Sequence, residues 1–195
     1  MLQRELVSYR CCTYYIHRTL SKTGRVIEMG IVSTILGKNK NETPPICDVD
    51  LERYLGTWYE IARYPHRFEE GLDNATAQYT LRSDGRIQVI NSGLRNGKRV
   101  EAKAVATVPD KNCTGRLLVS FFWPFKGEYR VILLGKDYNY VVVTSSTMDY
   151  LWILSRQPTI RKDLYDELTA FVASKGYDLK KIIWVKQDQN ESKIS

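Results

Sequence analysis

Short runs in which apolar and polar residues alternate follow one another along the chain from residue 57 to residue 155. Alternation with a period of two is typical of strands that bury one face, and segments rich in Gly, Asn and Asp separate the runs. Most of these segments are short enough for hairpins, so consecutive strands should pair antiparallel in a meander. The pattern predicts eight strands, at residues 57–64, 75–82, 86–94, 99–108, 116–122, 129–134, 140–145 and 150–155.

Two segments depart from this alternation. Residues 66–74 are longer than a tight hairpin and should fold over one mouth of a barrel, where a ligand would enter. Residues 159–174 show apolar side chains at helical spacing, and residues 182–185 predict a short final strand. We therefore expect an all-β fold: an eight-stranded antiparallel up-and-down β-barrel with one C-terminal amphipathic α-helix against its outer wall and a short final strand.

The start of the first strand and the end of the eighth carry a matching pair of residues. Gly56 lets the chain turn tightly into a strand, and Trp58 offers a broad apolar ring whose N–H needs a partner. Arg156 could lay its guanidinium on that ring and donate hydrogen bonds to nearby carbonyls. We expect these three residues to close one end of the barrel. Glu60 could form a buried ion pair with Arg63 or with Arg156, which would serve structure rather than recognition.

Strand parity predicts which side chains line the barrel, because residues two apart face the same side of its wall. Ala102, Ala104 and Ala106 share one face of the fourth predicted strand, and such small side chains would leave a cavity rather than fill it. A pocket of this kind is mostly apolar with a few placed polar groups. The predicted ligand-lining residues are Glu60, Ala62, Ala77, Tyr79, Val89, Asn91, Ala104, Val119, Phe121, Tyr129, Val131, Tyr140 and Trp152.

The net charge of +7 is concentrated at the N-terminus, because residues 1–42 carry seven Lys and Arg against three Asp and Glu. The other 153 residues carry only +3, without a basic helix or zinc-finger spacing, so we expect no nucleic-acid partner. We divide the chain into a basic leader (1–46), which is disordered or reflects a misassigned start, a folded domain (47–187) and a polar tail (188–195).

The leader contains no secretory signal peptide and no lipobox, because charged residues interrupt its apolar stretches. A translation start at Met29 would create a myristoylation pattern at Gly30. The spacing of the four cysteines matches neither a zinc site nor a redox motif, so we expect no metal and no cofactor. Cys47 and Cys113 could form a disulfide if the chain is exported.

Four motifs follow one another along the chain: GTWYEIAR (56–63), VSFFWPF (119–125), GKDYNY (135–140) and YLWILSRQPTI (150–160). In this order they resemble the motifs of the lipocalin family, in the branch of bacterial outer-membrane lipocalins and apolipoprotein D-like proteins. The resemblance covers about residues 49–187 and implies a calyx that binds a small lipophilic molecule, with fatty acids and lysophospholipids the usual cargo of the bacterial branch. Family members place ligand-contacting residues at the positions of Tyr79, Asn91 and Trp152. The resemblance also suggests the cell envelope, either outer membrane or periplasm.

Two other functions stay open at this point. A few lipocalin-fold proteins are isomerases, but the chain has only two histidines, His17 in the leader and His66 in the predicted entrance segment. They assemble no convincing nucleophile and base, so we expect no enzyme. An interaction module would use the aromatic residues at 121–125 to contact a membrane surface or a second copy of the chain as a homodimer, unless they pack against the entrance segment.

Overall fold

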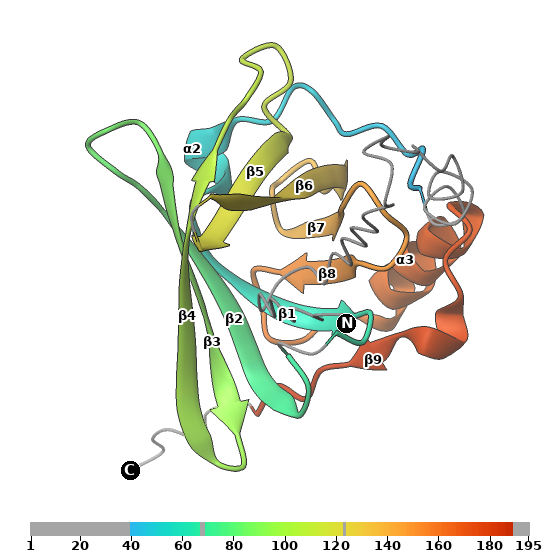
Figure 1. Ribbon diagram of the computed structural model, residues 1–195. Helices are drawn as coiled ribbons and strands as arrows, with labels where there is room; N and C mark the ends of the chain where they lie inside the picture. Colours follow the sequence, from blue (N-terminus) through green and yellow to red (C-terminus); the bar gives the residue numbers. More distant parts are fainter. Residues whose placement is uncertain (1–39, 67–68, 123, 189–195) are drawn as a thin grey trace, which may run out of the picture. The chain divides into compact units, whose positions relative to one another are not determined.

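A computed structural model describes residues 40–66, 69–122 and 124–188, and these form a barrel with a helix outside its wall (Figure 1). The predicted signal, lipidation and start-site features of the leader lie outside the described residues. One sheet runs in the order β2-β3-β4-β5-β6-β7-β8-β1-β9, and a further pairing of β2 with β1 closes it. All neighbouring strands that follow one another in the chain pair antiparallel, which confirms the predicted up-and-down meander.

All eight predicted strands are present, together with the short final one. The largest difference is at β6, which begins four residues earlier than predicted because Phe122 and Phe125 pair directly across a tight turn. The strands are β1 (Gly56–Arg63), β2 (Leu72–Leu81), β3 (Ile87–Arg95), β4 (Lys98–Thr107), β5 (Arg116–Phe122), β6 (Phe125–Leu134), β7 (Tyr140–Thr144), β8 (Leu151–Ser155) and β9 (Ile183–Trp184).

Within the described ranges, three helical segments accompany the barrel. The predicted amphipathic helix is α3 (Lys162–Ser174), which begins three residues later than expected. Two short segments were not predicted: α2 (Leu51–Tyr54) and the 3-10 helix η2 (Leu179–Lys181). The side chain of Asp50 caps α2 by accepting hydrogen bonds from two backbone N–H groups of its first turn. No helix in the described ranges has the length and hydropathy that a membrane crossing requires.

Apolar side chains form two separate clusters, one on each side of the barrel wall. The inner cluster fills part of the barrel and includes Trp58, Leu117 and Val131. The outer cluster lies between the wall and α3, where Leu168 and Val172 are fully buried. The apolar stripe of α3 therefore covers the outer face of the wall, as the sequence predicted.

The folded part of the chain begins before the predicted boundary at residue 47. Asn41 is almost completely buried, and its amide donates hydrogen bonds to Thr144 Oγ1 (2.8 Å) and to Tyr177 Oη (3.0 Å). A disulfide joins Cys47 to Cys113 and fastens the segment that leads into α2. At the C-terminal end, Asp188 of the predicted tail forms hydrogen bonds with Asn74. The residues after Asp188 lie outside the described ranges.

Candidate ligand-binding site

One end of the barrel, here called the floor, is closed by Tyr54, Gly56, Trp58 and Arg156. Trp58 is fully buried, and its indole N–H donates to the carbonyl of Tyr54 at 2.9 Å. The predicted cation–π contact is present, with the Arg156 guanidinium carbon 3.8 Å from the ring centroid of Trp58. The guanidinium donates to the carbonyls of Arg53, Tyr54, Leu55, Thr57 and Tyr138.

Gly56 is required at the floor for two reasons. Its φ of +95° lies where residues with a Cβ are strained, and an added Cβ would stand 3.3 Å from a guanidinium nitrogen of Arg156. The sequence therefore places a glycine where the chain turns from α2 into β1 beneath the cation.

Three tyrosine hydroxyls form a chain above the floor. The Tyr129 hydroxyl lies 2.5 Å from that of Tyr54 and 3.0 Å from that of Tyr79. The three hydroxyls carry three protons but form only two hydrogen bonds with one another. One proton therefore has no acceptor among the three tyrosines, whichever way the two bonds are directed. Burial raises the pKa of Tyr79 to about 12 and raises the pKa values of Tyr54 and Tyr129 well above the ordinary range. The hydroxyls therefore stay protonated and can donate.

The wall above the tyrosines is mostly apolar. Asn91 shares the face of Val89, a buried member of the inner cluster, and its Oδ1 is buried with no hydrogen-bond partner among the described residues. Val119 and Trp152 pack against the inner cluster and are only partly buried. The predicted lining residues that contribute to the inner cluster are Ala77, Tyr79, Val89, Ala104, Val119, Tyr129, Val131 and Trp152.

A group of charged and aromatic residues, here called the mouth cluster, lies at the opposite end of β1. It consists of Glu60, Arg63, His66, Glu69 and Trp152. Arg63 is buried and donates to Glu60 Oε1 at 2.7 Å and to the carbonyls of Glu69 (2.5 Å) and Leu72 (3.1 Å). Glu69 Oε2 lies 2.7 Å from His66 Nε2 and accepts from the Trp152 indole at 3.1 Å.

The mouth cluster holds two buried carboxyl groups against one guanidinium. Burial, with a further contribution from the nearby Glu69 carboxylate, raises the pKa of Glu60 to about 8, although its hydrogen bond to Arg63 acts in the opposite direction. Glu60 pairs with Arg63 and not with Arg156, which resolves the alternative that the sequence left open. The protonation state of Glu60 therefore affects the electrostatics of this end of the barrel.

Three of the predicted lining residues do not face the interior. A bulge between Glu60 and Ala62 reverses the parity of β1, so Ala62 joins the outer cluster and Arg63 turns inward. Tyr140 packs on the outer side beside α3, because Val141 and Val143 are the inward residues of β7. Phe121 follows a bulge in β5 and is 37% exposed. The inward placements predicted for Ala62, Tyr140 and Phe121 are wrong.

Sequence reasoning also missed several polar residues of the site. Tyr54 lies in a helix of one turn that the periodicity did not reveal, although the preceding Asp50 is a typical N-cap residue. Glu69 and His66 lie in a segment without periodicity, and only the structure brings them to Trp152. The described residues contain no group of three or more His, Cys, Asp or Glu side chains positioned to hold a metal ion.

Comparisons with known proteins agree with this geometry. Residues 49–187 match the model of the Lipocalin-like domain. The chain is 47% identical over 154 residues to the outer membrane lipoprotein Blc of Citrobacter freundii, with 74% of this chain and 86% of that protein covered. It is 32% identical over 172 residues to apolipoprotein D of Mus musculus, with 81% and 90% covered.

A solved structure supports the same fold. Insecticyanin from the tobacco hornworm Manduca sexta superposes with a TM-score of 0.63 at 22% identity, covering 77% of this chain and 86% of that one. At this identity the likeness concerns the fold alone. The barrel, its motifs and these relatives together place the chain in the lipocalin family, whose members bind small hydrophobic ligands.

Proposed function

We propose that this lipocalin binds a fatty acid or a lysophospholipid in its barrel and carries or sequesters it. The supporting observation is the combination of an apolar inner wall with polar groups that lack partners. The tyrosine chain has one hydroxyl proton to spare, and Asn91 Oδ1 has no donor among the described residues. The alkyl chain of a lipid would match the apolar wall, and an oxygen at its polar end would accept the spare tyrosine proton. A free hydroxyl, such as that of a lysophospholipid, could in addition donate to Asn91 Oδ1.

Burial of the alkyl chain supplies the driving force in this proposal. Each buried methylene contributes about 0.8 kcal/mol, so several of them offset the cost of association and give micromolar affinity. Membership of a family that binds small hydrophobic ligands favours a lipophilic cargo, and the disulfide between Cys47 and Cys113 fits an oxidising compartment.

We propose a carrier and not an enzyme. The described histidine, His66, lies 2.7 Å from Glu69 Oε2 and against the Trp152 ring, contacts that fit a structural role. Arg63 is bonded to Glu60 and to backbone carbonyls, which fits a structural cation. Absence of turnover with lipid esters, under conditions in which the same lipids bind, would support this part of the proposal.

Fluorescence titration of the full chain tests the cargo. Fatty acids and lysophospholipids should quench Trp emission saturably at micromolar concentration, and Trp152→Phe should lose most of that quenching because Trp152 packs against the inner cluster. Trp184→Phe is the matched control, since Trp184 lies outside the barrel on β9. If neither lipid class gives a saturable response, the proposed cargo is wrong.

A second candidate function rests on exposed aromatic residues at the turn between β5 and β6. Phe122 is 61% exposed, and Phe121 and Phe125 are 37% and 39% exposed. Such a group fits contact with a membrane surface or with a second copy of the chain. Phe122→Ser should then reduce vesicle co-sedimentation or dimer formation without changing lipid quenching, and unchanged values for both would remove this candidate.

A further inference from the structure

The barrel wall has a seam between β1 and β2. β1 pairs with β2 only through Gly56–Tyr59, and beyond that point the same edge of β1 pairs with β9 at Ala62 and Arg63. The chain after β9 bridges the seam, because the Asn74 N–H donates to the Lys186 carbonyl at 2.8 Å. β9 therefore lies between β1 and β2 in this part of the wall and keeps the two strands apart on the outer side of the barrel.

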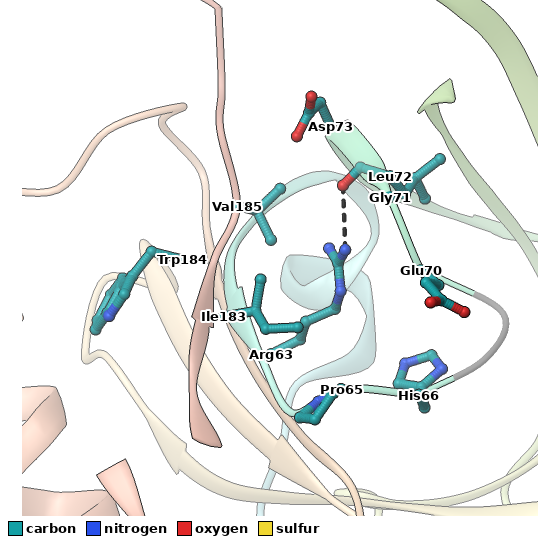
Figure 2. Close-up of a pocket in the computed structure, with 10 residues that line it drawn as sticks. All are labelled: Arg63, Pro65, His66, Glu70, Gly71, Leu72, Asp73, Ile183, Trp184 and Val185. Atoms are coloured by element: carbon teal, nitrogen blue, oxygen red, sulfur yellow. Dashed lines mark hydrogen bonds between the residues drawn. The ribbon is translucent and has the colours of Figure 1, made fainter. Parts of the chain in front are cut away.

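A cleft of about 450 Å³ opens at this seam, within the size range of small-molecule sites (Figure 2). Ile183 of β9 and Val185, which directly follows β9, form an apolar side, while Leu72 and Asp73 of β2 lie across from them. Arg63 lies at the base, where it donates to the Leu72 carbonyl. The cleft is thus separated from the barrel interior by a buried side chain.

The charge of the cleft is negative. Glu70 and Asp73 line it, are exposed, and have no ion-pair partner among the described residues. Arg63 adds no net positive charge at the base, because the Glu69 carboxylate lies 3.9 Å from its Nε. The nearby Lys186 is already paired with Asp188 at 3.1 Å.

We propose that this cleft is a second ligand site, outside the barrel, for a small amphipathic cation with an alkylammonium group. The alkyl part would pack on Ile183 and Val185, and the ammonium group would lie near Glu70 and Asp73. Ile183 is 40% exposed in the free protein, so its burial by an alkyl group is favourable. An anionic amphiphile of the same length is rejected by the unpaired carboxylates. The site is independent of the cargo in the barrel.

The test compares two probes of equal chain length, decyltrimethylammonium and decanoate, by calorimetry on the full chain below their micelle concentrations. The double variant Glu70→Gln/Asp73→Asn should weaken binding of the ammonium probe about fivefold, as expected for two partly exposed charge contacts. The matched control is Asp48→Asn/Asp137→Asn, which removes the same charge from exposed positions at the floor end. Decanoate binding, if present, should not weaken in either variant.

Competition separates this site from the barrel. With a saturating lysophospholipid present, the ammonium probe should still bind, and backbone amide resonances of Ile183 and Val185 should shift. If the lysophospholipid does not bind, the proposed cargo is contradicted. The binding of the ammonium probe to the wild type and the double variants still tests the cleft in that case. The cleft proposal is overturned if the ammonium probe does not bind, if both double variants weaken it equally, or if the lysophospholipid displaces it.

Discussion

The floor and the mouth cluster each hold a buried or partly buried arginine, but they satisfy it in opposite ways. Arg156 lies on Trp58 and donates only to backbone carbonyls, so no carboxylate is brought into the floor. Arg63 is bonded to Glu60 and lies beside Glu69 and its histidine partner. The floor is therefore held by neutral acceptors, whereas the mouth contains Glu60, a carboxyl group whose pKa is raised by burial.

This difference separates structural from responsive parts of the barrel. Backbone carbonyls do not titrate, so the floor contacts should keep their strength across the ordinary pH range. The disulfide between Cys47 and Cys113 adds a covalent connection on the same side as α2. The described residues of the mouth cluster have no disulfide, and their carboxyl groups are desolvated. Changes at the floor should thus alter stability at every pH, and changes at the mouth should alter how stability varies with pH.

The largest effect is expected from truncation at the floor. Trp58→Ala removes a fully buried indole, the ring under Arg156 and the donor to Tyr54, and should lower the free energy of unfolding by about 3–5 kcal/mol. Chemical denaturation followed by circular dichroism measures it. Trp184→Ala is the control, because this exposed ring contacts Tyr165 on the outer surface and should cost less than about 1 kcal/mol. Equal losses in the two variants would contradict a floor held by Trp58.

The next effect concerns the covalent connection near the floor. Cys47→Ala/Cys113→Ala opens a loop of sequence separation 66 and should cost about 2–4 kcal/mol, chiefly by freeing the unfolded chain. Thermal unfolding with and without reductant provides the measurement. Reductant should lower the melting temperature of the wild type and leave that of the double variant unchanged. A wild-type curve insensitive to complete reduction would refute the expected contribution.

Arg156→Lys should have a smaller but clear effect. Lysine keeps the charge but cannot spread over the indole while donating to several carbonyls, so the variant should lose about 1–3 kcal/mol. Denaturation at pH 5 and pH 8 should give the same loss, because carbonyl acceptors do not titrate. A loss that differs strongly between the two pH values would show that the floor shares the electrostatics of the mouth.

The sequence predicted the fold well because most strands bury one face. It predicted the inward-facing residues less well where a strand buries both faces. β7 reads Tyr-Val-Val-Val, and both of its faces are covered, one by the inner cluster and one by α3. A strand buried on both faces shows no alternation, so the phase that placed Tyr140 inside had no support in the pattern.

Bulges explain the other two errors. The bulge after Glu60 adds a residue to one side of the ladder, which turns Ala62 outward and Arg63 inward. A second irregularity in β5 shifts Phe121 toward solvent. Single bulges leave no reliable mark in hydrophobic periodicity, because they depend on the register with a neighbouring strand. The tyrosine chain was missed for a related reason, since its members meet only across elements distant in sequence. In the mouth cluster the pair of Glu60 with Arg63 was among the predicted alternatives, whereas the contact of Glu69 with Trp152 joins residues 83 positions apart.

A different kind of effect, a change in the pH dependence of stability, is expected at the mouth. The pKa of Glu60 is about 8 in the folded barrel and near 4.3 in an unfolded chain, so the folded state binds this proton more tightly. Its contribution to stability is fully present below the unfolded pKa and is lost as pH rises toward 8. Glu60→Gln removes this titration, so the melting temperature of the wild type should fall relative to the variant between pH 5 and pH 8. Glu52→Gln, at an exposed position of α2, should follow the wild-type curve. Parallel curves for wild type and Glu60→Gln would mean that Arg63 keeps Glu60 ionised throughout, and the contrast between a neutral floor and a titrating mouth would fail.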